Sequence, residues 1–528
     1  MRDNRRDRLI LFCLALIVRL LTAWLLTGPP YMDAHYYTVG TWRLVEGYGL
    51  TEPFLWHYLD NPTGIPHPGF LYWMPLPSIL AAPLVALPFP LLGRSFLAVQ
   101  LPFVLLSALL PLVSYSVAQA VTGLRRHAWA AGLLTLFSGF FVPFWTLPET
   151  FAPFALFGSL ALWLSGRGMQ EARGRKQIAG LLVGLLVGLA HLTRADGVLL
   201  LPVVAFAPLA SVRSRNTQHA LRAVIGRWSL IILGYLLVMG PWFIRNLNVI
   251  GTPLSPAGMK TLWLTTYDDL FCYGCDLSSR SYLAWGSRQI LHSKLVALWI
   301  NFQRLVVEDC LVFLLPFVFI GLYRLRRRPP FTLSLIYLLL LYLAHSLAFT
   351  FSGWRGGFFH SSGALLPFLH AAAMEGLDAA VGWVARRRRS WKVRPARAVF
   401  TVGSIALAIF SSLYASLDKL PSWWSADQIY REIGTWLSRQ GVSNSTIVMV
   451  GNPPGFWYNT RRPAVVAPNG DVETLLEVCD RYGVGYVVLD ANRPALLAAL
   501  YEGQSTSERL VLATTFEEDG VLMWRVEP

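Results

Sequence analysis

The chain has 528 residues, of which 54% are hydrophobic and only 14% are charged. So few charges exclude an ordinary soluble protein. The formal net charge of +15 raises the question of nucleic-acid binding. However, 25 of the 45 Lys and Arg residues fall in six short segments between apolar stretches, with only three acids among them. This pattern is typical of cytoplasmic loops facing anionic lipid headgroups, and it predicts a lipid bilayer and no nucleic acid as the partner. The six segments are 1–8, 125–127, 167–176, 213–227, 324–328 and 386–397.

The apolar stretches predict a polytopic α-helical membrane protein. Residues 9–28 are long enough to cross a bilayer, and the arginines before them predict a cytoplasmic N-terminus. No cleavage site follows, so we expect this stretch to be retained as an anchor, with Arg19 facing the interior of the bundle. Eleven crossings of a prokaryotic plasma membrane then place all six basic segments inside. They are 9–28, 96–120, 128–146, 150–166, 177–192, 196–211, 228–244, 308–323, 331–350, 361–382 and 398–417.

The remaining segments lie outside the cell in this scheme. Residues 29–95 and 245–307 form two long outer loops, and the Pro-rich stretch 74–92 predicts a helix in the outer interface, because a crossing there would reverse every later basic loop. Residues 421–528 predict a small extracytoplasmic α/β domain, while 1–420 form the membrane module. The expected strands of the α/β domain are 445–451, 464–468 and 485–490, and its expected helices are 425–439 and 472–482.

Two short motifs resemble a nucleotide-binding loop and a zinc site, but their sequences do not support either. The glycines of GLLVGLLVGLA, residues 180–190, have the spacing of close helix packing inside a membrane, not of a nucleotide loop. Cys272 and Cys275 form a CxxC in the second outer loop, which leaves a local disulfide open. A zinc site would need two further ligands, and the sequence has none at the spacing typical of zinc sites.

The candidate site residues are ionisable groups in the outer loops. Asp33 lies in YMDAHYY directly after the first crossing, where it is either a base at the membrane surface or the cap of a helix that begins near His35. We expect other acidic and basic side chains to lie at the same depth as Asp33 at the outer membrane surface. These are Glu149, Arg194, Asp196, Arg245, Arg355 and His360. His35, His57 and His67, with Asp60, match no tight metal-ligand spacing, so dependence on a divalent metal stays open.

Carboxylates and guanidiniums on one membrane face suit sugar transfer from a lipid phosphate. A carboxylate would take the acceptor proton as the sugar C1 gains oxocarbenium character, and arginines would neutralise the departing phosphate. Since nucleotide sugars are cytoplasmic and this face is outside, the expected donor is a polyprenyl-phosphate sugar. The alternative is a lipid-linked glycan transporter or flippase, which would more often show inverted repeats and midplane polar residues.

An ordered series of motifs resembles the GT-C superfamily of membrane glycosyltransferases, and most closely the bacterial relatives of protein O-mannosyltransferases and aminoarabinose transferases. The motifs are DAHYY, EGYGLTEP, PHPGFLYWMPLPSIL, GRSFLAVQLP, ETFAPFALFG, GLAHLTRADGVLLLP, PWFIRNLNVIGTPLSP and HSSGALLPFL. The resemblance implies an inverting enzyme with Asp33 as catalytic base. It also implies that Arg245, Arg355 and Arg194 hold the donor phosphate.

Two positions depart from the family pattern. Many members carry a second acid beside the first-loop Asp, whereas this chain has Ala34, so a second carboxylate would come from Glu149 or Glu46. The loop that often carries an Arg-Tyr pair reads Arg355-Gly-Gly-Phe-Phe-His360 here. We expect His35, Tyr36, Tyr37 and His360 to bind substrate. The hexose or pentose transferred and the glycan, lipid or protein acceptor stay open.

Overall fold

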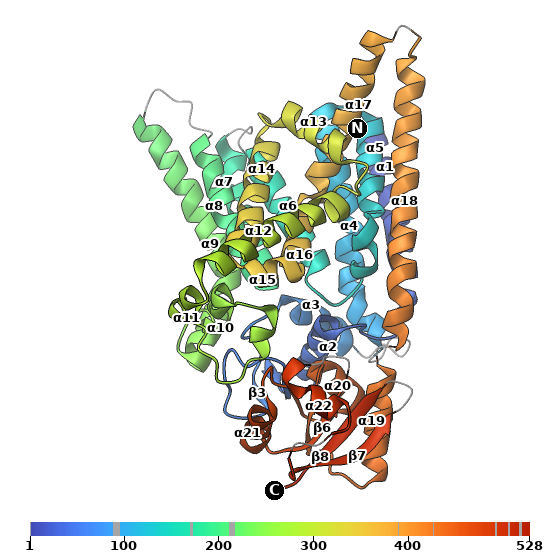
Figure 1. The fold of residues 1–528 in the computed structure, drawn as a ribbon. Coiled ribbons are helices and arrows are strands. Elements are labelled where there is room, and N and C mark those ends of the chain that lie inside the picture. Colours follow the sequence, from blue (N-terminus) through green and yellow to red (C-terminus); the bar gives the residue numbers. More distant parts are fainter. Residues whose placement is uncertain are drawn as a thin grey trace. The chain divides into compact units, whose positions relative to one another are not determined.

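The computed structural model describes residues 2–87, 95–168, 173–210, 217–388, 390–425, 427–490, 494–504, 507–516 and 520–528. The chain divides into two compact units, each considered by itself (Figure 1). Unit 1 comprises residues 1–25, 100–253 and 292–420, and unit 2 comprises 26–99, 254–291 and 421–528. The sequence predicted 1–420 as one module. The structure instead groups most of both outer loops with the C-terminal segment, because strands and helices from these three stretches share one core.

Unit 1 is helical. Its long helices follow the predicted apolar stretches, although parts of the basic segments 167–176 and 213–227 lie outside the described residues. The helices are α1 (Arg2–Trp24), α4 (Phe96–Thr122), α5 (Arg125–Leu136), α6 (Phe151–Gly168), α7 (Arg173–Thr193), α8 (Leu200–Ala210), α9 (Thr217–Ile250), α12 (Ser287–Arg304), α13 (Leu315–Leu325), α14 (Pro329–Leu343), α16 (Phe358–Ser362), α17 (Leu366–Arg387) and α18 (Val393–Ser425).

Five helical stretches among the described residues are long and apolar enough to cross a membrane. They are Phe96–Thr122, Leu221–Ile250, Pro329–Ala348, Thr350–Arg387 and Val393–Arg439. Some of the other predicted crossings contain only a shorter apolar helix, such as Leu315–Leu325 with 11 residues. At 1.5 Å per residue such a helix does not span the hydrocarbon by itself. A membrane location is supported, and the count of eleven stays a prediction.

The predicted crossing 128–146 is not one continuous helix. α5 ends at Leu136, and a 3₁₀ helix follows over Gly139–Phe144. Gly139 has a left-handed backbone with φ of 60°, and Pro143 lies within the 3₁₀ segment. Both features interrupt an α-helix, so this stretch was wrongly predicted as a single helix.

Glycines bring the helices of unit 1 into backbone contact. A Cβ on Gly184 of α7 would overlap the Ile231 carbonyl oxygen of α9, and one on Gly234 would overlap the Leu181 oxygen. Gly321 of α13 stands in the same relation to Ala372 of α17. This is the small-residue packing that the glycine spacing predicts, and it is strong between membrane helices because lipid offers no hydrophobic drive for association.

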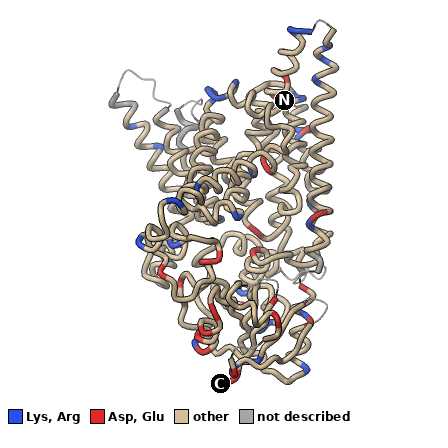
Figure 2. The backbone as a smooth tube through the Cα atoms, viewed as in Figure 1, with Lys and Arg blue, Asp and Glu red and all other residues tan. Residues whose placement is uncertain are grey.

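Polar contacts join the basic ends of the unit 1 helices. The Arg125 guanidinium donates to both carboxylate oxygens of Asp7 at 2.6 Å. Arg126 and His127 pair with Asp378 near the end of α17. Figure 2 shows the basic turns between α13 and α14 and between α17 and α18 at the same end of these helices. The clustering agrees with the charge pattern of the sequence, and its assignment to the cytoplasm stays a prediction.

Arg19 is buried in α1, as its place in an apolar stretch predicts. Its Nη2 donates to the Leu136 carbonyl oxygen at 2.9 Å, and its guanidinium lies 5.9 Å from the ring centroid of Trp145. The charge therefore faces the interior of the bundle and contacts protein groups in place of lipid.

Unit 2 contains a six-stranded sheet with strand order β2-β5-β4-β6-β8-β7. β2 (Phe54–Leu55) comes from the first outer loop and pairs in parallel with β5 (Ala464–Val466). The other strands are β4 (Ile447–Val450), β6 (Val484–Leu489), β7 (Leu510–Phe516) and β8 (Val521–Val526). β5, β4 and β6 are parallel, whereas β8 and β7 continue the sheet antiparallel.

Helices α19 (Gln428–Arg439), α20 (Pro453–Thr460) and α21 (Val472–Tyr482) accompany the sheet of unit 2. The second loop adds α10 (Pro256–Lys260) and α11 (Ser279–Ala284), and Cys272 and Cys275 are joined by a disulfide. The first loop adds α2 (Met32–Val45) and α3 (Leu76–Ala86). α3 has 11 residues, too few to cross a bilayer, which agrees with the predicted interfacial helix; residues 88–92 of that prediction lie outside the described residues.

His57 makes unit 2 sensitive to acid. Its side chain is 3% exposed, and burial lowers its pKa from 6.5 to about 4. Between these pH values the unfolded chain binds a proton that the folded chain does not, so stability falls as the pH drops through this window. We expect a loss of about 3 kcal/mol by pH 4. Hydrogen exchange of the β4 and β6 amides at pH 7 and pH 4.5 measures it. A His57→Phe variant with the same pH dependence as wild type would contradict this assignment.

Candidate active site

A polar cluster in unit 1 forms around the turn between α7 and α8. Arg194 Nε donates to Asp196 Oδ1 at 3.1 Å and to Ser361 Oγ at 2.9 Å. The two side chains of the pair are 18% and 11% exposed. The turn is tight because Gly197 lies against the backbone of α7, where a Cβ would come within 2.6 Å of the Ala190 carbonyl oxygen.

Asp196 has two further partners, from the α14 and α16 regions. His345 Nε2 lies 2.8 Å from Asp196 Oδ2, and the Ser361 hydroxyl donates to the same oxygen at 2.5 Å. His345 reaches this position because the segment Gly353–Gly357 packs directly on it. A Cβ on Gly353 would overlap the His345 carbonyl oxygen, and one on Gly357 would lie 2.9 Å from the His345 ring. Gly353 and Gly357, on either side of Arg355, therefore serve close packing.

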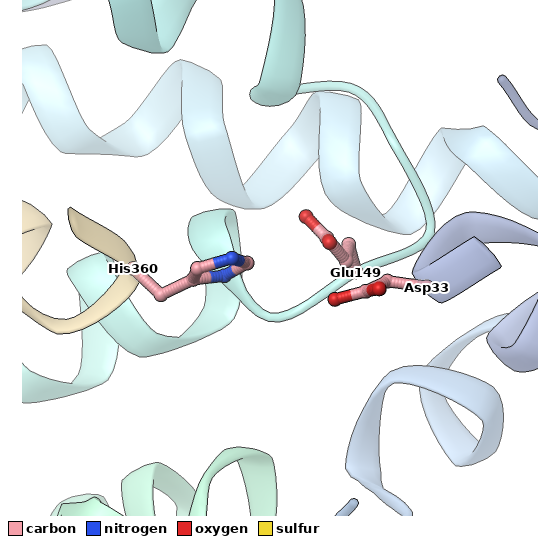
Figure 3. Close-up of side chains that lie close together, drawn as sticks. All are labelled: Asp33, Glu149 and His360. Atoms are coloured by element: carbon pink, nitrogen blue, oxygen red, sulfur yellow. The ribbon is translucent and has the colours of Figure 1, made fainter. Parts of the chain in front are cut away.

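Glu149 and His360 come together at the edge of this cluster. Figure 3 shows the two side chains, Glu149 from the loop before α6 and His360 from α16. A carboxylate oxygen of Glu149 and a ring nitrogen of His360 lie within 4.8 Å of each other. Glu149 is 1% exposed. Thr150 links the pair to Arg194, because its Oγ1 lies 2.8 Å from His360 Nδ1 and 3.4 Å from Arg194 Nη1.

The other two predicted phosphate-binding arginines, Arg245 and Arg355, have contacts outside the Arg194–Asp196 pair. Arg245 Nη1 donates to Asn246 Oδ1 at 3.0 Å, and its guanidinium lies 4.9 Å from the ring of Trp242 in the same helix. The side chain of Arg355 is exposed. Its backbone carbonyl accepts from Arg304 Nη2 at 3.4 Å, so Arg304 brings another guanidinium to this segment.

In unit 2, Asp33 lies in the first turn of α2. The helix begins at Met32 with Tyr31 as its N-cap residue, so the expected cap at Asp33 before a helix near His35 is wrong by two residues. A carboxylate in the first turn is nevertheless favoured by the helix dipole. Asp33 is partly exposed, unlike the residues that follow it.

His35, Tyr36 and Tyr37 are buried, and their substrate role stays a prediction. They are 0%, 2% and 1% exposed. His35 Nδ1 lies 2.9 Å from the Tyr31 carbonyl oxygen, and its Nε2 lies 2.9 Å from Asp427. The Tyr36 hydroxyl donates to Glu52, whose pKa is raised by burial. The three side chains hold α2 within unit 2.

His35→Ala should therefore weaken unit 2 and spare chemistry. Removing the ring leaves a cavity and an uncompensated carboxylate at Asp427, which is 7% exposed, for a loss of about 3 kcal/mol of unfolding free energy. Thermal unfolding measures the loss, and kcat/KM of the folded fraction should change less than about threefold. An unchanged melting temperature with a large loss of kcat/KM would support a substrate role for His35.

Among the described residues, the first-loop histidines lie near single acids and backbone oxygens. His67 Nε2 lies 3.0 Å from the Phe54 carbonyl oxygen and 3.5 Å from Glu52, while His57 Nδ1 lies 3.4 Å from Asp60. Among the described residues, these side chains do not bring three ligand atoms together. Glu149 and His360 are the two unit 1 groups that fit a cation, although zinc sites need at least three protein ligands.

His345, Ser361 and Thr150 were not singled out from the sequence. His345 lies in an apolar stretch, and an ionisable residue there is a recognisable signal of a functional site or a buried partner. Ser361 and Thr150 carry no such signal, because hydroxyls are common in membrane helices. Their role depends on contacts between residues more than 150 positions apart.

Comparisons with known proteins agree with this architecture. Residues 77–244 match the family model described as dolichyl-phosphate-mannose-protein mannosyltransferase. The fold is similar to ArnT from Cupriavidus metallidurans bound to undecaprenyl phosphate, with a TM-score of 0.61 and 14% identity over 98% of this chain and 97% of that chain. No curated protein sequence matches the chain significantly.

The oligosaccharyltransferase AglB from Archaeoglobus fulgidus, in complex with an inhibitory peptide and a dolichol-phosphate, also has a similar fold. Its TM-score is 0.57 at 14% identity, over 92% of this chain and 69% of that chain. A second structure of the Archaeoglobus enzyme, in complex with Zn and sulfate, gives the same TM-score and identity over 94% and 69%. The resemblance carried by the sequence motifs is thus confirmed: the chain has the fold of the GT-C membrane glycosyltransferases and resembles the protein O-mannosyltransferases in sequence over residues 77–244.

Proposed function

We propose that this protein transfers a sugar from a polyprenyl-phosphate donor to an acceptor hydroxyl on the outer face of the membrane. The observation that carries the proposal is the cluster of Arg194, His345, His360 and Glu149, which collects phosphate-binding and acid–base groups inside a fold shared with a protein bound to undecaprenyl phosphate. Such a set has the charges that sugar transfer from a lipid phosphate needs.

The arginines of unit 1 supply the electrostatics in this proposal. Arg194 is held in one orientation by Asp196 and Ser361, which fixes the position of its positive charge for a phosphate group. Arg245 and Arg355 are assigned to the same role by the resemblance. As the bond from C1 to the phosphate oxygen breaks, the leaving phosphate gains charge that these guanidiniums stabilise.

Asp33 is proposed as the base, on the resemblance and on its partial exposure at the start of α2. It would accept the proton of the acceptor hydroxyl as the oxygen attacks C1 from the face opposite the phosphate, which inverts the anomeric centre. Glu149 is proposed as the second carboxylate. Glu149 and His360 would hold a divalent cation if the reaction uses one, and the cation would neutralise phosphate charge.

The test is transfer by purified protein in lipid. Radiolabelled polyprenyl-phosphate sugars serve as donors, membrane extract supplies the acceptor, and product and released lipid phosphate are measured. Wild type should transfer sugar with inversion, and Asp33→Asn should be at least 100-fold slower while folded. Asp276→Asn, an exposed acid of the second loop, is the matched control and should be unchanged.

The outcomes distinguish the glycosyltransferase with Asp33 as base from an enzyme with another base and from a transporter. If wild type and Asp33→Asn transfer equally, Asp33 is not the base, and Glu149→Gln is the next variant. If wild type consumes no donor under any condition but moves lipid-linked glycan across vesicles, the protein is a transporter and the proposal is wrong.

A further inference from the structure

A pocket of about 900 Å³ lies in unit 2. It is formed by the C-terminal end of α2, the turn that follows, and the C-terminal end of α20, two helices that pack against each other. Its volume is within the range of small-ligand sites. The lining residues are Arg43, Val45, Glu46, Tyr48, Trp457 and Arg461.

Arg43 is the first unusual feature of this pocket. Its side chain is only 8% exposed, although it lines the cavity. Nη2 donates to Thr51 Oγ1 at 2.7 Å, and the guanidinium carbon lies 4.0 Å from the ring centroid of Tyr48. The Nε–H has no hydrogen-bond partner among the described residues. Burial leaves the Arg43 charge less solvated than that of an exposed arginine, so an anion in the pocket that Arg43 lines is favoured.

Arg461 is the second unusual feature. It ends α20 in the left-handed region with φ of 59°, which costs energy for a residue with a side chain. Its guanidinium carbon lies 4.3 Å from the ring centroid of Trp42 and 4.4 Å from that of Trp457. Glu46 Oε1 is 3.7 Å from Nη1, longer than a hydrogen bond. The two indoles therefore fix the guanidinium in place.

The two arginines share one arrangement. In each, the guanidinium carbon lies within 4.4 Å of the centroid of an aromatic ring, while the N–H edge is the part of the group that recognises an oxyanion. That edge matches the paired oxygens of a phosphate or carboxylate. With Glu46 as the one acid among the lining residues, the pocket carries an excess positive charge.

We propose that this pocket binds an oxyanion, a phosphate or a carboxylate, carried on a sugar-sized ligand. Arg43 and Arg461 bind the oxyanion, and the exposed ring of Tyr48 contacts the body of the ligand. If the proposed transfer function holds, this ligand is the acceptor, which makes the acceptor class an anionic glycan or glycolipid. Oxyanion binding itself does not depend on the transfer function.

The test is isothermal titration of the full chain in phosphatidylcholine nanodiscs with glucose 6-phosphate, inorganic phosphate and glucose. Glucose 6-phosphate should bind saturably, inorganic phosphate more weakly, and glucose not at all. Arg43→Gln and Arg461→Gln should each weaken binding at least tenfold. Arg525→Gln, an exposed arginine of the same unit paired with Glu527, is the matched control and should bind as wild type does.

Further arms separate the sources of the oxyanion and guard against misfolding. If phosphatidylglycerol in the nanodisc abolishes sugar-phosphate binding in wild type, a lipid headgroup is the source, and the oxyanion site stands. Arg43→Lys keeps the charge and should retain part of the affinity, which a misfolded variant would not. Asp33→Asn should bind glucose 6-phosphate normally, so a failed transfer function leaves this result intact. Binding that is absent in wild type, or equal in wild type and both Gln variants, overturns the proposal.

Discussion

Arg194→Met should lower transfer at least 100-fold and also lower the melting temperature. The guanidinium contacts Asp196, Ser361 and Thr150, so its loss removes the proposed phosphate ligand and leaves a carboxylate that is 11% exposed with less compensation. Breaking a buried pair from one side costs about 3–5 kcal/mol, and the remaining His345 and Ser361 contacts place this case at the lower end.

A double variant separates the two effects. Replacing both members of a buried ion pair by apolar residues is often neutral for stability, so Arg194→Met with Asp196→Leu should regain much of the lost melting temperature. It should stay inactive if Arg194 binds the donor phosphate. Recovery of transfer together with stability would show that Arg194 is only structural. Arg324→Met, which breaks an exposed pair with Glu375 in the same unit, is the control and should change neither quantity.

Gly321→Ala should have the largest effect on stability. The new Cβ would overlap the Ala372 carbonyl oxygen, and Gly376 faces Phe317 in the same way, so α13 and α17 would have to separate. We expect a loss of more than about 4 kcal/mol, seen as little folded, monodisperse protein in size-exclusion chromatography.

The matched control is Gly403→Ala in α18. No atom lies within 4 Å of a Cβ at that position, so the change should be neutral or add up to about 1 kcal/mol through helix propensity. A Gly321→Ala protein that melts within two degrees of Gly403→Ala would contradict the close packing of α13 and α17.

Local sequence patterns predicted the parts of the fold that depend on neighbouring residues. The predicted helix 472–482 coincides with α21, and the predicted strand 464–468 contains β5. β2, with two residues, could not be predicted because its pairing partner lies in a distant segment. The antiparallel strands β7 and β8 were also missed. The weak signal in β8 has a physical reason, because its residues alternate between buried and more exposed only in part.

For the candidate site, too, local patterns predicted some residues, whereas contacts between distant residues were not predicted. The motifs around Glu149, Arg194 and His360 were found from residue type and position, and Thr150 contacts both Arg194 and His360 in unit 1. The pairing of His35 with Asp427 could not be predicted, because a histidine at a helix start gives no sign of a partner almost 400 residues away. Sequence patterns identify which residues are ionisable, whereas burial, which turns a ligand into a structural pair, depends on the tertiary fold.

The pairing of β2 with β5 has a consequence for biosynthesis. The Tyr58 hydroxyl donates to the Val466 carbonyl oxygen across 408 residues of sequence. At a synthesis rate of roughly 5–20 residues per second, the first loop waits about 20–80 s outside the membrane before its partner strand emerges. During that time its apolar segment is open to aggregation or to a chaperone. A chain released early by the ribosome therefore leaves an unfinished outer loop, which gives quality-control proteases a signal of incomplete synthesis.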